Sequence, residues 1–130
     1  MFDVSVLDEF SAAHRLVEYN GDCERLHGHN WKVRAVFRSH TLNSQGLAID
    51  FRIARSMLRD ILKSFDHAFL NDVPLLQSLN PSCEHLAQRI YESLRDKLMS
   101  VDPDLTNVSV YEVTVWESDR TNVTYREVVS

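Results

Sequence analysis

Hydrophobic and polar positions alternate along two stretches in the first third of the chain, and this alternation predicts two strands. The first stretch covers residues 2–16, where the even-numbered positions are mostly apolar. The second covers residues 27–39, where one parity carries His27, His29, Trp31, Val33, Ala35 and Phe37. Residues 18–26 between them are expected to form a loop, because Tyr19-Asn20-Gly21-Asp22 has the composition of a turn.

Two later stretches place apolar residues three and four positions apart, which predicts helices. The first helix follows Asp50, a residue suited to capping its N-terminus. The second follows Asn80-Pro-Ser82, with Ser82 as its cap, and ends at Asp102-Pro103. Two further β-rich segments are expected at residues 107–117 and 121–129. The apolar face of the first helix is expected to be Phe51, Ala54, Leu58, Ile61 and Phe65, and that of the second Leu86, Ile90, Leu94 and Leu98.

The predicted order of elements is β-β-α-α-β-β, which is typical of an α+β fold. We expect one domain over residues 1–130, with an antiparallel sheet on one side and two helices on the other. A sheet of four strands has two edges, and a second copy of the chain can pair with them. The pattern therefore favours a homo-oligomer.

Composition narrows the class of protein. The 130 residues are 44% hydrophobic and 25% charged, as in an ordinary soluble protein, and no apolar run is long enough to span a membrane. A net charge of -5 argues against a nucleic-acid-binding protein. No signal peptide is recognisable, and Cys23 and Cys83 are too few for a disulfide scaffold, so we expect a cytoplasmic protein.

Three of the six histidines form a candidate metal site. His27 and His29 are two residues apart on a predicted strand, so both imidazoles project from the same face. His14 lies at the end of the neighbouring predicted strand with matching parity. Three imidazoles favour Zn²⁺ over Mg²⁺ or Ca²⁺, and three protein ligands leave a fourth position open, as catalytic zinc requires. The sequence therefore predicts a zinc site at His14, His27 and His29.

Cys23 lies in the loop four residues before His27. A nearby cation favours the thiolate form of a cysteine, which can act as a base or as a nucleophile. Alternatively, Cys23 is a fourth zinc ligand that closes the site into a structural centre. The spacing alone leaves both interpretations open.

Other polar residues are weaker candidates. Asp66-His67 can form a carboxylate–imidazole pair, provided that the backbone is irregular there. Glu117 ends a β-type run, where it can accept two parallel hydrogen bonds from a guanidine-like edge or serve as an edge charge that discourages aggregation. Glu84 lies in the first helical turn, where it complements the helix dipole, and Cys83 is expected to be a small buried residue.

Several motifs occur in the order found in a known family. They are Phe10-Ser-Ala-Ala-His14-Arg-Leu16, Cys23-Glu-Arg-Leu-His27-Gly-His29-Asn-Trp31, Asp50-Phe51, Asp66-His67-Ala-Phe-Leu-Asn71, Asn80-Pro-Ser-Cys-Glu84-His-Leu-Ala87 and Trp116-Glu117. Over essentially its whole length the chain resembles the 6-pyruvoyltetrahydropterin synthase / 6-carboxytetrahydropterin synthase family. The most specific motif is the Cys-x₃-His-Gly-His block with an upstream Ala-His.

The resemblance implies a tunnelling fold (T-fold), in which subunits join their sheets into an antiparallel barrel with the helices outside. It implies a homohexamer built as a dimer of trimers, with active sites between subunits. By motif position, it also implies zinc ligands at His14, His27 and His29, a catalytic cysteine at Cys23, a relay at Asp66 and His67, a pterin anchor at Glu117, and further substrate contacts at Ser82 and Glu84.

The gap of three residues between Cys23 and His27 resembles bacterial 6-carboxytetrahydropterin synthases of queuosine biosynthesis. Those enzymes convert 7,8-dihydroneopterin triphosphate to 6-carboxytetrahydropterin and release acetaldehyde and triphosphate. The alternatives are a pyruvoyltetrahydropterin synthase that acts on the same substrate and a non-catalytic, zinc-stabilised assembly module. After Glu117, Ser118-Asp119-Arg120 departs from the small or Thr-rich residues usual in the family. A triphosphate needs cations to bind it, and the candidates are Arg15, Arg25, Lys32 and Arg120.

Overall fold

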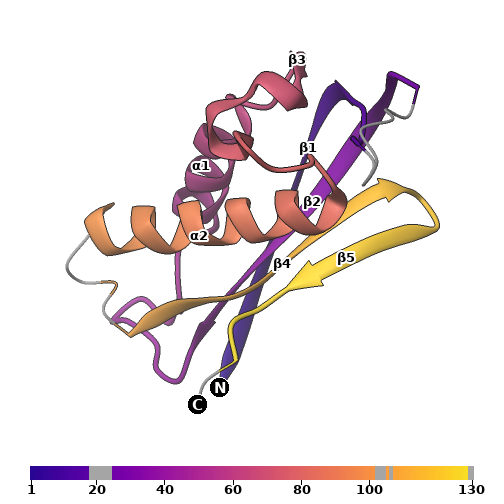
Figure 1. Ribbon diagram of the computed structural model, residues 1–130. Helices are drawn as coiled ribbons and strands as arrows, with labels where there is room; N and C mark the ends of the chain where they lie inside the picture. The colour runs from indigo at the N-terminus through magenta and orange to yellow at the C-terminus, as the bar shows by residue number, and fades with distance from the viewer. Residues whose placement is uncertain (18–24, 102–104, 106, 129–130) are drawn as a thin grey trace.

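The computed structural model describes residues 1–17, 25–101, 105 and 107–128, so Cys23 lies outside the described residues. The elements along the chain are β1 (Phe2–His14), β2 (His27–Ser39), α1 (Phe51–Leu62), β3 (Ala68–Phe69), the 3₁₀ turns η1 (Leu70–Asp72) and η2 (Pro74–Leu76), α2 (Cys83–Val101), β4 (Val108–Ser118) and β5 (Thr121–Tyr125). Figure 1 shows the two helices on one side of a long, twisted sheet. The fold class is α+β, as the sequence predicts.

The sheet has five strands in the order β3-β1-β2-β4-β5. The expected sheet of four antiparallel strands is wrong in one respect: β3 pairs with β1 in parallel, through Ala12↔Ala68 and Ala13↔Phe69. This strand has two residues and therefore no periodicity that a sequence pattern can show. Beside β3, the backbone N–H of His67 donates to the Ser11 carbonyl at 2.6 Å, which fixes the chain against β1.

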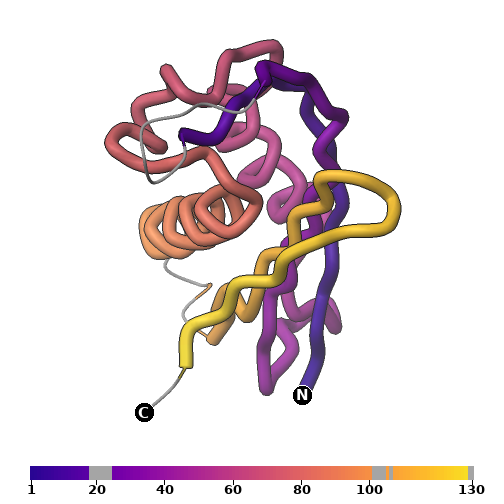
Figure 2. Tube along the Cα trace, turned by 45° about the vertical axis from the view of Figure 1, so that its right-hand side comes forward, coloured from indigo at the N-terminus to yellow at the C-terminus, as the bar shows by residue number. Residues whose placement is uncertain are grey.

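Both helices cover the same face of the sheet, as Figure 2 shows from a second direction. The core between the two layers is built from alternate residues of β1, β2 and β4 and from the apolar faces of the helices. The apolar face of α1 is confirmed from Ala54 onwards, whereas Phe51, in the first turn, is 60% exposed. The largest fully buried side chains include Trp31, Phe37 and Phe65.

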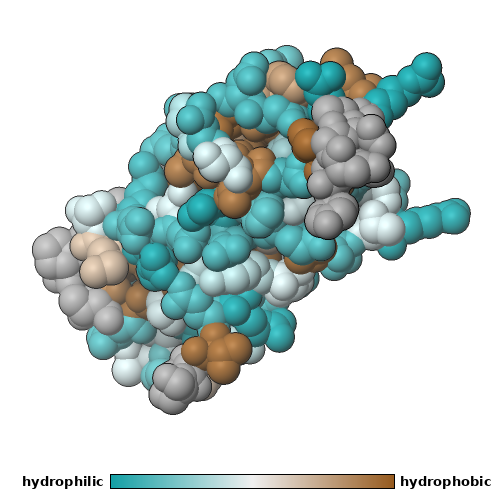
Figure 3. Space-filling model, viewed as in Figure 1, coloured by the Kyte–Doolittle hydropathy of each residue, from teal (hydrophilic) through white to brown (hydrophobic). Residues whose placement is uncertain are grey.

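The predicted helix caps are confirmed. The Asp50 carboxylate accepts the backbone N–H of Arg52 at 2.8 Å, and the Ser82 hydroxyl accepts the backbone N–H of His85 at 3.1 Å. In the described part of the chain, no helix is both long and apolar enough to cross a membrane. Figure 3 shows hydrophilic residues over most of the face in view, with a few separate apolar patches.

Candidate active site

The register of β1 and β2 brings the three candidate histidines together. His14 pairs with His27 and Ala12 pairs with His29, so all three imidazoles project toward the helices at one end of the sheet. The ring centroids of His14 and His27 are 4.6 Å apart, and those of His27 and His29 are 4.7 Å apart. One ligand atom from each of the three, together with a carboxylate oxygen of Glu117, lies within 4.8 Å of all the others.

Backbone carbonyls orient two of these rings. Nδ1 of His14 donates to the Pro81 carbonyl and Nδ1 of His27 donates to the Arg25 carbonyl, both at 2.8 Å. A carbonyl can only accept, so each neutral ring carries its proton on Nδ1 and has a lone pair on Nε2. Metal-binding histidines in proteins are held in this way, with the second ring nitrogen donating to a carbonyl or carboxylate.

The Nε2 atoms of His14 and His27 are 3.0 Å apart. In the neutral rings neither atom has a proton to donate, so a cation or an added proton is needed to join them. A tetrahedral zinc ion with Zn–N bonds of about 2.0–2.1 Å separates its ligand nitrogens by about 3.3 Å, which is close to this spacing. The residues present therefore fit a zinc ion, and His14, His27 and His29 are the side chains that would hold it.

The Trp31 ring packs against the rings of His14 and His29. Its side chain is fully buried, its centroid lies 4.9 Å from that of His14 and 5.2 Å from that of His29, and its indole N–H donates to the Ala12 carbonyl at 3.3 Å. The Phe10 ring stacks on Trp31. This packing leaves the histidine rings little freedom to turn away from one another.

Glu117 lies beside the histidines, near the end of β4. Its Oε1 atom is 3.2 Å from Nε2 of His29, and the side chain is 37% exposed. The sequence predicts a substrate contact at Glu117 but not its position near the metal ligands. Trp116 pairs with Lys32, and Glu117 follows it at an irregularity in the pairing of β4 with β5, so alternation along the sequence alone does not place this carboxylate beside the histidines.

Asp66 and His67 form the carboxylate–imidazole pair that the sequence suggests. Oδ1 of Asp66 lies 3.1 Å from Nδ1 of His67, and His67 has a φ of 57°. This left-handed conformation is the irregular backbone that lets two adjacent side chains meet. Asp66 also accepts the backbone N–H of Ser11 at 3.0 Å. That bond, with the neighbouring His67, holds the pKa of the Asp66 carboxyl below its ordinary value.

The pair does not join the histidine group in the described residues. His67 is 83% exposed and lines a shallow depression of about 440 Å³ with Ser11, Ala13, Gly28, His29 and Asn30 among others. Neither Asp66 nor His67 belongs to the group of atoms within 4.8 Å around His14. In the described residues, the Asp–His pair therefore lies outside the group of candidate metal-ligand atoms, although His67 and His29 line the same depression.

The start of α2 carries the remaining predicted substrate contacts. The Ser82 hydroxyl is used as the helix cap, and Glu84 is exposed in the first turn. Cys83 is buried and its thiol donates to the Val115 carbonyl at 3.1 Å. Burial, with added repulsion from Glu117 and Glu84, raises the pKa of the Cys83 thiol to about 11. Cys83 is therefore a structural residue, as the sequence predicts.

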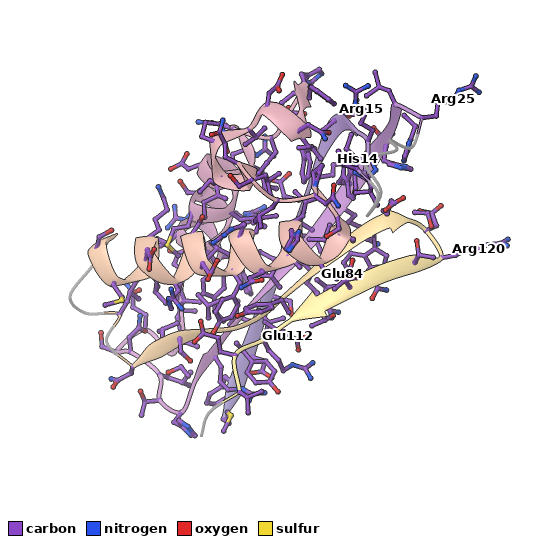
Figure 4. All side chains as sticks on the ribbon, in the orientation of Figure 1. His14, Arg15, Arg25, Glu84, Glu112 and Arg120 are labelled. Atoms are coloured by element: carbon purple, nitrogen blue, oxygen red, sulfur yellow. The ribbon has the colours of Figure 1, made fainter. Side chains whose placement is uncertain are left out.

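The candidate cations for a triphosphate lie at different places. Figure 4 shows Arg15 and Arg25 at the same end of the molecule as His14, and Arg120 at the tip of the β4–β5 hairpin. Lys32 is 4.4 Å from the ring centroid of Trp116, on the sheet face that the helices leave open. In the chain, Arg15 directly follows His14 and Arg25 lies two residues before His27.

Comparison with known proteins agrees with this geometry. A model of the family described as 6-pyruvoyl tetrahydropterin synthase matches residues 3–128. The chain is 34% identical to a 6-carboxy-5,6,7,8-tetrahydropterin synthase of Synechocystis sp., over 79% of this chain and 80% of that protein. It is 25% identical to the protein of the same name from Aquifex aeolicus, over 97% of this chain and 98% of that protein.

Solved structures show the same fold. The 6-pyruvoyl tetrahydropterin synthase of Caenorhabditis elegans superposes with a TM-score of 0.80 at 22% identity, and covers 98% of this chain and 96% of its own. That of Plasmodium vivax superposes with a TM-score of 0.76 at 23% identity, and covers 99% and 100%. The T-fold expected from the sequence is confirmed by these neighbours.

Proposed function

The chain belongs to the 6-pyruvoyl tetrahydropterin synthase family, and on that premise we propose that it is a zinc-dependent lyase of the 6-carboxytetrahydropterin synthase type. Its substrate is 7,8-dihydroneopterin triphosphate, and its products are 6-carboxytetrahydropterin, acetaldehyde and triphosphate. The observation that carries the proposal is the arrangement of His14 and His27, whose carbonyl-bound Nδ1 atoms leave both Nε2 atoms directed at one point. The names of the curated relatives support this product over pyruvoyltetrahydropterin.

In this mechanism zinc, when bound, supplies Lewis acidity at oxygens of the substrate's side chain and makes the adjacent C–H more acidic. The Cys23 thiolate removes a proton from that side chain. His67, held by Asp66 at 3.1 Å, relays protons on the other side. The Glu117 carboxylate receives the amino-pyrimidinone edge of the pterin, and its place 3.2 Å from His29 sets the bound pterin next to the histidines. Ser82 and Glu84 are further candidates to contact the pterin.

The complete site is proposed to form between copies of the chain, in a cytoplasmic homohexamer of two trimers. Two features support this. In the described residues of one chain, neither Asp66 nor His67 belongs to the group of candidate metal-ligand atoms. In the described residues, the outer side of β5 and most of the outer side of β1 have no strand partner, because β3 covers only Ala12 and Ala13. The pathway that the proposal favours is queuosine biosynthesis.

A product assay tests the reaction. Zinc-loaded protein incubated with 7,8-dihydroneopterin triphosphate should give 6-carboxytetrahydropterin by mass spectrometry and an equal amount of acetaldehyde. A pyruvoyltetrahydropterin product without acetaldehyde would instead identify the second member of the family. Cys23→Ala should retain zinc and the fold but lose activity, whereas the matched variant Cys83→Ala should remain active. Loss of zinc and fold in Cys23→Ala would identify a structural ligand.

A complementation assay tests the shared site. Cys23→Ala and Asp66→Asn are each expected to be inactive. If one site takes Cys23 from one chain and Asp66 from another, unfolding and reassembling the two variants together should restore about a quarter of the sites. Mixtures that stay as inactive as the separate variants would place both groups in one chain.

A further inference from the structure

Two asparagine side chains hold the segment that follows His14. Oδ1 of Asn71 accepts the backbone N–H of Arg15 at 3.1 Å, and its Nδ2 donates to the Arg15 carbonyl at 2.8 Å. Asn80 does the same to Val17, with both bonds at 2.7 Å. Each amide thus satisfies the donor and the acceptor of one backbone residue, which is what a neighbouring strand does in a sheet.

The two amides continue the pairing of β3 along the same edge of β1. β3 pairs with Ala12 and Ala13, and the register of β1 with β2 ends at His14↔His27. Arg15 and Val17 are two residues apart, so in an extended chain their backbone groups point to the same side. The asparagines therefore act as a side-chain ladder that keeps the chain extended beyond the last residue of β1.

Asn80 is linked to His14 by its neighbour in the chain. The carbonyl of Pro81 is the group that accepts the Nδ1–H of His14 at 2.8 Å. The turn at residues 80–82 is itself fixed to α2, because the Asn80 carbonyl accepts Nδ1–H of His85 at 2.6 Å and Ser82 caps the helix. One turn therefore orients the His14 ring and also holds the backbone three residues further along.

We propose that Asn80, assisted by Asn71, is a positioning residue for His14 in the metal site. It fixes the chain on the C-terminal side of His14 and places the Pro81 carbonyl that determines which ring nitrogen of His14 is available. Both asparagines occur in the sequence motifs described above, where neither has an assigned role. This inference rests on the zinc site of the proposed function.

The test compares Asn80→Ala and Asn71→Ala with the matched variant Asn43→Ala. Asn43 also uses its side chain to accept backbone N–H groups, those of Gln45 and Leu47, but it follows the opposite end of β2. The dissociation constant for zinc is measured by competition with a chromophoric chelator, and the ligand geometry by the visible absorption of the Co²⁺ form. Asn80→Ala is expected to bind zinc about 10–100-fold more weakly, as other groups that orient metal ligands do when changed.

Asn71→Ala is expected to weaken zinc binding less than Asn80→Ala, and Asn43→Ala not at all, even where it lowers stability. If Asn80→Ala does not fold, Asn80→Asp serves instead, because it keeps the acceptor for Val17 but loses the donor. A zinc affinity and a Co²⁺ spectrum of the Asn80 variants equal to those of the wild type would overturn the inference alone. A wild-type protein that binds no zinc would overturn the proposed function with it.

Discussion

Replacing His27 by Ala is expected to abolish zinc binding and yet leave the metal-free protein almost as stable as the wild type. In the metal-free protein the Nε2 atoms of His14 and His27 lie 3.0 Å apart, and each has its proton on the other nitrogen. Their mutual contact therefore contributes little or is unfavourable. The bond from His27 to the Arg25 carbonyl is exposed, so water can replace it. A change within about 1 kcal/mol is expected.

His14→Ala is the contrasting variant. His14 is 1% exposed, and its loss removes a buried ring and leaves the Pro81 carbonyl without its donor. Creating a cavity and an unpaired acceptor together should cost about 2–4 kcal/mol in the metal-free protein. Zinc at about 100 times its dissociation constant should stabilise the wild type by about 2.7 kcal/mol, and neither variant at all. For a domain of this size that corresponds to a rise in Tm of about 10 °C.

Urea unfolding with and without a chelator, at one fixed protein concentration, measures both effects. The metal-free His27→Ala protein should unfold near the wild-type midpoint, and zinc should shift only the wild type. If metal-free His27→Ala is destabilised as much as His14→Ala, the two rings stabilise the fold through their own contact. That result would contradict the assignment of both protons to Nδ1.

Two further variants and one labelling experiment test the surroundings of the site. Trp31→Phe should lose about 2–3 kcal/mol in urea unfolding, because it leaves a void and removes the hydrogen bond to the Ala12 carbonyl; an unchanged midpoint would contradict the tight packing. Because the pKa of Asp66 is lowered in the folded state, its stabilising effect is full above its ordinary value and is lost as the pH falls through the folded value. Asp66→Asn should therefore show a shallower loss of urea stability than the wild type as the pH falls below about 4, the ordinary value of an aspartate, and parallel curves would count against the Ser11 contact. Cys83, with a pKa raised to about 11, should not react with iodoacetamide at about pH 8 until the protein is unfolded, as peptide mass mapping would show; labelling of the native protein would mean that the thiol is accessible.

The regular elements could be predicted because their patterns are local. The strand at residues 27–39 has the predicted bounds, and Asp50 and Ser82 cap the two helices as expected. The pairing of β3 with β1 could not be predicted, since it depends on two residues and on backbone contacts across more than fifty positions of the chain. The sequence also gives no sign that Phe51 lies outside the core.

The site shows the same division. The parity of His27 and His29, and the placing of His14 on the adjacent strand, follow from alternation alone. The carbonyls of Pro81 and Arg25 orient the rings. They are backbone groups that every residue has, so the residue types at these positions could not predict the two hydrogen bonds. The place of Glu117 beside His29 depends on the register of β4, which is set by long-range pairing.

X-ray absorption at the zinc edge of the zinc-loaded protein tests most directly whether the three histidines form an open, catalytic zinc site. An open site should show only nitrogen and oxygen neighbours at about 2.0–2.1 Å, from the histidines and an exchangeable ligand. His27→Ala should bind no zinc and should therefore give no spectrum of this kind. A sulfur neighbour at about 2.3 Å would show that Cys23 closes the site as a structural ligand, and would contradict the catalytic role proposed for it.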